Sequence, residues 1–134
     1  MNTARIIVVV VGIFLPYLAR VPGGADWVQQ YTNVGVIGLL FFGAFNALVW
    51  GSILGLSFIY RRAIPLLVPC LIGFGFLCWA HYSLDLAADA QAAIALIFIP
   101  IFALPLVAVG GALGYLLDRR LRRDDGAPAS PSGR

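Results

Sequence analysis

The chain has 134 residues, of which 61% are hydrophobic and 11% are charged, and its mean hydropathy is +0.94. A soluble domain carries about a quarter of its residues as charged side chains, so this chain is too apolar to cover a water-facing surface. We therefore expect an integral membrane protein. Its net charge of +3 comes from arginine beside apolar segments, which gives a nucleic-acid partner little support.

The first predicted element is a helix over residues 4–19. A basic residue before a short apolar run also fits a signal peptide, with residues 23–25 as a small-residue cleavage site. We favour a retained helix, because the apolar run ends well before residue 25 and Tyr17 and Arg20 would anchor its outer end. A short helical turn over 27–31 would then lie in the membrane interface.

The second predicted element, residues 34–60, contains no charged side chain. As a helix it would be about 40 Å long, against a hydrocarbon core of about 30 Å. Small residues recur in it at every fourth position, which is the pattern by which membrane helices approach one another closely. We call these positions the small-residue stripe: Gly43, Ala47, Gly51 and Gly55.

Polar side chains lie on the flank of this stripe, namely Asn46, Trp50 and Ser57. The amide of Asn46 must find a partner in the membrane, either on another helix or at the indole N–H of Trp50. We favour a structural bond between helices. The alternative is that Asn46 and Ser57 line a pore or contact a ligand.

The remaining predicted spans are residues 63–82 and 90–117. Cys70 and Cys78 in the third span are too far apart on one helix, at about 12 Å, to form a disulfide with each other. Pro100 and Pro105 divide the fourth span and free backbone carbonyls that something must satisfy. Towards its end the fourth span carries a second close-contact pair of small residues, Gly110 and Gly114.

Arginine placement predicts the orientation of this four-helix bundle. One side would carry Arg5, Arg61, Arg62, Arg119, Arg120, Arg122 and Arg123. The opposite side would carry only Arg20, so the positive-inside rule places both termini in the cytoplasm. All basic residues are arginine and all acidic residues are aspartate, which indicates a GC-rich bacterial genome and hence the inner membrane. Residues 1–117 form the predicted membrane domain, and 118–134 a disordered basic tail.

A weak candidate metal site is formed by His81, Asp85 and Asp89, which would share one face if a helix ran through them. We favour the interpretation that the two aspartates cap the fourth helix. The chain otherwise shows no nucleophile–base pair, phosphate loop or metal cluster, and no ionisable residue in its four apolar cores. This argues against an enzyme, a bound cofactor and an ion-coupled transporter.

The sequence therefore predicts an all-α bundle of four transmembrane helices that acts without catalysis, through helix–helix contacts with a membrane partner or with a second copy. A complex subunit, an assembly factor and a toxin-immunity protein all fit this description. The alternative is a homo-oligomeric channel or facilitator for a small solute or ion.

Overall fold

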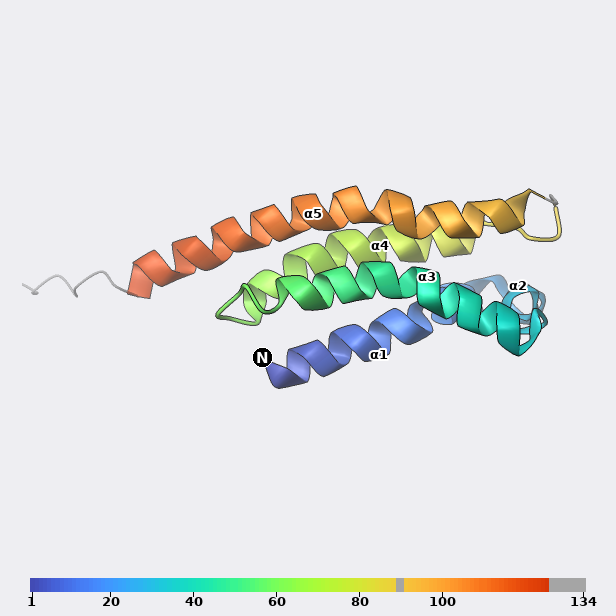
Figure 1. The fold of residues 1–134 in the computed structure, drawn as a ribbon, viewed down its shortest axis with the longest axis horizontal. Coiled ribbons are helices and arrows are strands. Elements are labelled where there is room, and N and C mark those ends of the chain that lie inside the picture. The colour runs from blue at the N-terminus through green and yellow to red at the C-terminus, as the bar shows by residue number, and fades with distance from the viewer. Residues whose placement is uncertain (89–90, 126–134) are drawn as a thin grey trace, which may run out of the picture.

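The computed structural model of the chain describes residues 1–88 and 91–125, and it is an elongated bundle of long helices (Figure 1). The elements are α1 (Asn2–Leu18), η1 (Val21–Gly23), α2 (Ala25–Thr32), α3 (Gly35–Leu56), η2 (Ile64–Leu66), α4 (Leu67–Ser83) and α5 (Ala92–Asp125), where η marks a short 3₁₀ turn. The part of the chain that is described contains no strand. Four segments are long and apolar enough to cross a membrane, namely Asn2–Gly23, Gly35–Leu56, Ile64–Ser83 and Ala92–Asp125. The prediction of an all-helical protein with four spans is confirmed, and the chain is a multi-pass membrane protein.

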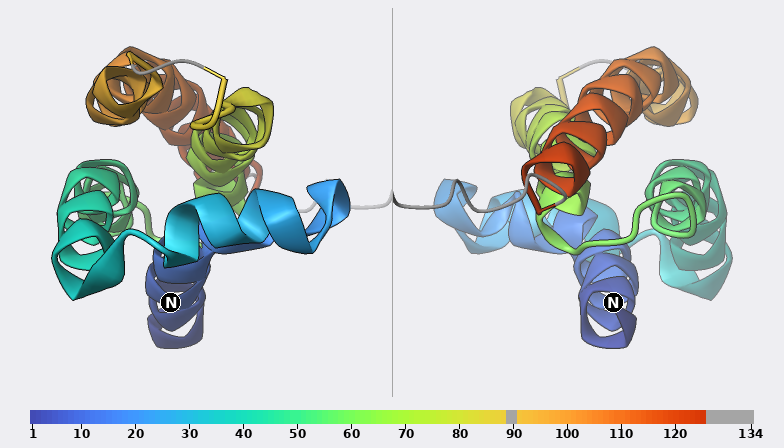
Figure 2. Two further views of the ribbon diagram at one scale, coloured as in Figure 1. Left: turned by 90° about the vertical axis from the view of Figure 1, so that its right-hand side faces the viewer. Right: turned by 90° about the vertical axis from the view of Figure 1, so that its left-hand side faces the viewer.

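The four long helices run along the axis of the molecule and surround a common core, as the end-on views show (Figure 2). α1 and α5 lie opposite one another, and each packs against both α3 and α4. α2 lies across one end of the bundle, which we call the α2 end. The start of α1 and the finish of α5 lie at the other end, the terminal end (Figure 1).

The core consists of apolar side chains from every long helix, and several of them are completely buried. Val8 on α1, Ile53 on α3, Leu77 on α4 and Val107 on α5 are between 0 and 3% exposed. Many other large apolar side chains point outward, and Ile37 is 85% exposed. Such a surface would promote aggregation in water, but it suits a protein that is surrounded by lipid.

Close contact between α5 and the η2–α4 segment depends on the predicted pair Gly110 and Gly114. A Cβ atom added at Gly110 would lie 2.8 Å from the Cα of Pro69. One added at Gly114 would lie 2.6 Å from the carbonyl oxygen of Pro65 and 2.8 Å from the hydroxyl of Tyr60. These glycines are therefore packing residues, as predicted, and the contact they make lies within the chain.

The sequence did not predict a close contact between α1 and α3, which the structure shows at Gly12. A Cβ atom at Gly12 would lie 2.3 Å from the Cβ of Trp50, so only glycine admits the indole side chain at this crossing. Trp50, which was singled out as a polar residue, therefore serves to pack α3 on α1. No hydrogen bond of its indole N–H occurs within the described residues.

The second span ends earlier than predicted, at Leu56 rather than residue 60. Tyr60 turns back into the bundle, where it is 4% exposed and its hydroxyl donates to the carbonyl of Gly111 over 2.8 Å. Burial raises the pKa of this phenol, which keeps it a neutral donor. Helix propensity alone could not predict this ending, because a tertiary contact on α5 determines it.

The fourth span extends further than predicted, since α5 continues to Asp125. Residues 118–125 are therefore helical and not disordered, which corrects the predicted boundary after residue 117. Ion pairs account for the extension: Asp118 pairs with Arg122 one turn later, and Asp125 pairs with Arg62 in the loop between α3 and η2. The rest of the predicted tail, 126–134, lies outside the described residues.

Candidate functional site

A completely buried arginine lies at the α2 end, immediately after α1. Arg20 is 0% exposed, and its Nε donates to the carbonyl of Trp27 over 2.7 Å. Its Nη1 donates to the carbonyls of His81 and Leu84, over 2.8 and 2.7 Å. Its Nη2 donates to the amide oxygen of Gln30 over 2.5 Å. One guanidinium thus joins the end of α1, helix α2, the end of α4 and the loop that follows α4.

The positive charge of Arg20 is stabilised without a carboxylate in direct contact. Its guanidinium carbon lies 4.1 Å from the ring centre of Tyr31 and 4.8 Å from that of Trp27, which are cation–π distances. Gln30 bridges the cation to an acid: its amide oxygen accepts from Arg20, and its amide nitrogen donates to the carboxylate of Asp85 over 2.9 Å. The nearest acid is therefore one side chain removed from the cation.

A chain of hydrogen bonds leads from α2 through α4 to α3. The hydroxyl of Tyr31 lies 2.8 Å from Nδ1 of His81, and Nε2 of His81 lies 3.1 Å from the amide oxygen of Asn46. The amide nitrogen of Asn46 donates to the carbonyl of Phe42 over 3.1 Å. Because the Asn46 oxygen can only accept, the proton of His81 belongs on Nε2, and Nδ1 accepts from Tyr31.

All three side chains in this chain of bonds are buried and neutral in this arrangement. Tyr31 is 0% exposed, His81 is 1% exposed and Asn46 is 3% exposed. Burial raises the pKa of Tyr31 to about 12, so the phenol keeps its proton at physiological pH. We call the set of six bonded side chains the polar network: Arg20, Gln30, Tyr31, Asn46, His81 and Asp85. Its bonds satisfy buried polar groups on five segments: the end of α1, α2, α3, the end of α4 and the loop that follows α4.

The sequence reasoning identified Asn46 but not the centre of this network. The favoured interpretation of Asn46, a structural bond to another helix, agrees with its contact to His81 on α4. The sequence predicts Arg20 as an anchor at the outer end of the first helix, because nothing local to it shows that α2 and the loop after α4 fold over it. A signal was present in the sequence, since Arg20 is the only arginine on its side of the predicted topology.

The candidate metal site is not assembled by the described residues. His81 lies in the last turn of α4 with both ring nitrogens bonded to side chains, and Asp85 accepts from Gln30 and from the backbone N–H of Ala87. Asp89 lies outside the described residues. Within residues 1–88 and 91–125, no group of three or more histidine, cysteine or acidic side chains could hold a metal ion. Asp85 also does not cap α5, because it bonds within the loop and α5 begins at Ala92.

The sequence predicts no ionisable side chain in the four apolar cores, and the structure buries three such side chains near the ends of the candidate spans. Arg20, His81 and Asp118 all fall within candidate spans and are at most 1% exposed. Arg20 and His81 are fully bonded, as described above. Asp118 lies at the terminal end, where its carboxylate is 3.2 Å from Nη2 of Arg122. The bonded pair at the α2 end fits a structural role.

At the terminal end, Ser57 bonds to the first turn of α1. Its hydroxyl accepts from Nε of Arg5 over 3.0 Å, and its carbonyl accepts from Nη2 of Arg5 over 3.2 Å. The Arg5 guanidinium also lies 4.0 Å from the ring centre of Phe58. Asn46 lies near the middle of α3 and Ser57 directly follows its last residue, and each bonds to a different helix of the bundle.

The three glycines of the small-residue stripe on α3 face space that no described residue fills. A Cβ atom added at Gly43, Gly51 or Gly55 would meet no atom within 4 Å. The remaining member, Ala47, is half-buried. The stripe therefore differs from the glycines of α1 and α5, whose missing side chains are needed by the fold itself.

A shallow groove of about 390 Å³ borders the stripe between α3 and α5. One side is formed by Ser52 and Gly55 on α3 with Ile59 just after the helix, and Leu104 and Ala108 form part of the α5 side. Nearly all of its lining is apolar, and the hydroxyl of Ser52 is already bonded to the carbonyl of Leu48. The groove and the stripe together form a continuous surface of small and apolar residues on the outside of the bundle.

Comparison of the chain with protein-family models, with curated protein sequences and with solved structures finds no match. The function must therefore be argued from the residues and their geometry. The polar network is internally bonded and explains how the α2 end is held together. The stripe on α3 is a row of small residues at regular spacing whose glycines face space that no described residue fills, whereas Gly75 on α4 is a single such position.

Proposed function

We propose that the protein acts without catalysis, by binding an apolar helix of a membrane partner along the small-residue stripe of α3. The observation that carries this proposal is the empty space outside Gly43, Gly51 and Gly55. Each glycine within a helix costs about 1 kcal/mol relative to alanine. The packing of α3 within the described bundle does not need glycine at these positions. A close contact with another molecule would explain why glycine is present there.

The chemistry of the surface specifies the kind of partner. In lipid there is little hydrophobic drive between helices, so association depends on close packing, which small residues permit. The groove beside Gly55 adds a concave apolar strip in which larger side chains of the incoming helix would lie. The partner helix would therefore be apolar, with small residues opposite the stripe and branched or aromatic residues opposite the groove.

The setting that we propose is a bacterial inner membrane with both termini in the cytoplasm. The support is the arginine count, because the terminal end carries all but one of the arginines in residues 1–125. A role as a complex subunit, an assembly factor or a toxin-immunity protein follows from the same surface. These roles share the requirement that a specific membrane protein is held by α3.

The test replaces two stripe residues by leucine, as Gly51→Leu with Gly55→Leu, in a chain that carries a tag at its C-terminus. The matched control is Gly75→Leu on α4, where an added side chain also meets no atom within 4 Å. Native-membrane purification with mass spectrometry should give a stoichiometric partner for the wild type and the control. The double variant should insert normally but lose the partner by at least tenfold.

Two results would contradict the proposal. One is a double variant that retains its partner as well as the control does. The other is a wild-type particle that contains only this chain, at any copy number, after mild extraction. A homo-oligomer of that kind would call for measurements of solute flux in liposomes, since it fits the channel alternative.

A further inference from the structure

The last turns of α5 project beyond the rest of the bundle. A helix of 34 residues is about 51 Å long, whereas the hydrocarbon core of a bilayer is about 30 Å thick. At the terminal end, the bond from Tyr60 to Gly111 places the end of α3 beside that part of α5. Residues after Gly111 on α5 therefore approach the membrane surface. The ion pair between Arg62 and Asp125 joins the projecting part to the loop that follows α3.

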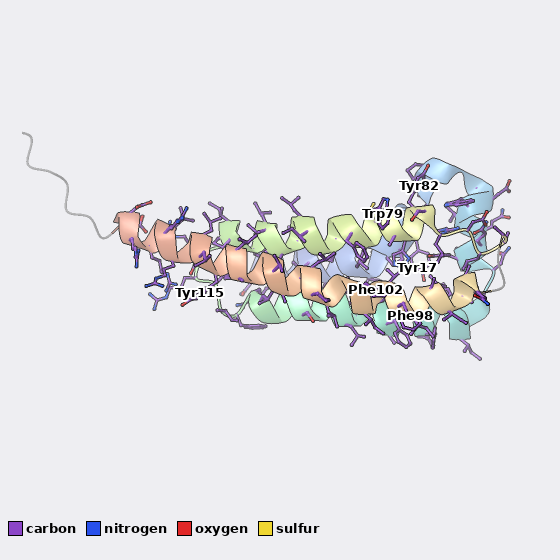
Figure 3. All side chains as sticks on the ribbon, turned by 90° about the horizontal axis from the view of Figure 1, so that it is seen from above. Tyr17, Trp79, Tyr82, Phe98, Phe102 and Tyr115 are labelled. Carbon is purple, nitrogen blue, oxygen red and sulfur yellow. The ribbon has the colours of Figure 1, made fainter. Side chains whose placement is uncertain are left out.

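One side of this projecting helix carries a basic depression of about 510 Å³, which is lined by Tyr115, Arg119, Arg122 and Arg123. The spacing of these residues, at four, three and one positions, keeps them on one side of an α-helix. Nitrogen-bearing side chains gather around the labelled Tyr115 at this end of the molecule (Figure 3). Aromatic side chains Trp79 and Tyr82 mark the opposite end of the bundle.

Two of the three arginines in the depression are not neutralised. Arg122 is held by Asp118, with Nη2 3.2 Å from the carboxylate and Nε donating to the backbone carbonyl over 3.3 Å. Arg119 and Arg123 are exposed and have neither a hydrogen bond nor an ion pair with any described residue. A fixed guanidinium flanked by two free ones is an arrangement suited to a phosphate group, which accepts from several donors at once.

We propose that this depression binds the phosphate of an anionic lipid headgroup. Its position selects a lipid over a soluble phosphate, because exposed apolar surface continues from it towards the bundle. Tyr115 and Leu116 are 43 and 51% exposed and lie one turn nearer the hydrocarbon than the arginines. Tyrosine is favoured at this depth of a membrane, and the acyl chains would continue along α5 below it.

The test measures lipid binding to the purified full-length chain by native mass spectrometry in a neutral detergent. The probes are phosphatidylglycerol, phosphatidylcholine with the same acyl chains, and glycerol phosphate, which has the anionic group without the chains. The variant is Arg119→Gln with Arg123→Gln. The control is Arg61→Gln with Arg120→Gln, which removes the same charge from exposed positions at the same end but outside the depression.

We expect phosphatidylglycerol to bind at least tenfold more tightly than phosphatidylcholine, with an affinity that falls as salt is added. An arginine that contacts the bound headgroup should contribute roughly a fivefold factor, so the variant should weaken phosphatidylglycerol binding roughly 25-fold. The control should weaken it much less, because its two arginines do not line the depression. Equal binding of the two lipids would overturn the proposal, and so would equal losses in variant and control. Glycerol phosphate that binds as tightly as the lipid would also overturn it, because the site would then be one for soluble phosphate.

Discussion

Replacement of Arg20 by methionine tests whether one buried guanidinium holds the α2 end together. The side chain is 0% exposed and donates four hydrogen bonds, to Trp27, Gln30, His81 and Leu84. Methionine has a similar length and no donor, so these acceptors lose their shared partner. The change also removes the cost of burying a charge, which makes its net effect smaller than the sum of four bonds.

The expected loss in the free energy of unfolding is about 3–5 kcal/mol. Four acceptors lose a charged donor, each such bond contributes about 1.5–3 kcal/mol, and the recovered cost of burying the charge offsets part of the sum. Arg20→Lys keeps the charge but not the planar fork, so it should lose about 1–3 kcal/mol. The control is Arg61→Met, which changes an exposed arginine without a partner among the described residues. It should leave the stability unchanged within error.

Unfolding can be followed by tryptophan fluorescence in mixed micelles, as the mole fraction of sodium dodecyl sulfate rises. Trp27 is a suitable reporter, because its ring centre lies 4.8 Å from the Arg20 guanidinium carbon. If Arg20→Met unfolds within about 1 kcal/mol of Arg61→Met, the guanidinium is not the tie that its contacts indicate. If Arg20→Met fails to insert, Arg20→Lys takes its place in the comparison. Arg20→Lys must then unfold more easily than Arg61→Met.

Three further predictions concern packing and ionisation. Because burial raises the pKa of Tyr31 from 10.0 to about 12, the stability that the buried phenol contributes should be intact below pH 10 and be lost between pH 10 and 12. Tyr31→Phe should reduce the late component of an ultraviolet phenolate titration, to which Tyr60 also contributes because burial raises its pKa. A single titration near pH 10 would contradict this. Gly110→Leu should lower the free energy of unfolding by at least about 1–3 kcal/mol, because its Cβ would lie 2.8 Å from the backbone of α4. The control Gly43→Leu should leave the thermal stability unchanged, because a side chain there meets no atom within 4 Å. Equal unfolding temperatures would refute that reasoning. Tyr60→Phe should lose about 1 kcal/mol, because a buried hydrogen bond 2.8 Å long disappears, and an unchanged midpoint would show that the bond contributes nothing.

The limits of local reasoning are clearest for Arg20. Its neighbours in the sequence form a turn, and a lone arginine after an apolar run is ordinarily a surface anchor. Its burial depends on the carbonyls of His81 and Leu84, which are 61 and 64 residues away. No pattern within one helix reports such a contact, so the sequence could show that this arginine is isolated but not that it is enclosed.

Small residues show the same limit in another form. Gly110 and Gly114 on α5 and the stripe on α3 have the same four-residue spacing, and the sequence assigned close packing to both. Only the arrangement of the helices shows that the α5 pair is filled by Pro65, Pro69 and Tyr60, whereas the stripe faces outward. Spacing reports which side of a helix is small, and it contains no information about what lies opposite.

The sequence by itself determined that this protein lies in a lipid bilayer and that it has four candidate spans. Those properties follow from local composition, because a run of about 20 apolar residues satisfies its own backbone bonds as a helix and has a favourable environment only in lipid. Tertiary structure alone decided which polar groups are buried, which glycines are used inside the bundle and which remain available to a partner. The burial of a polar group and the use of a glycine depend on contacts between residues far apart in the chain. The role of each residue therefore follows from the neighbour that the fold brings to it.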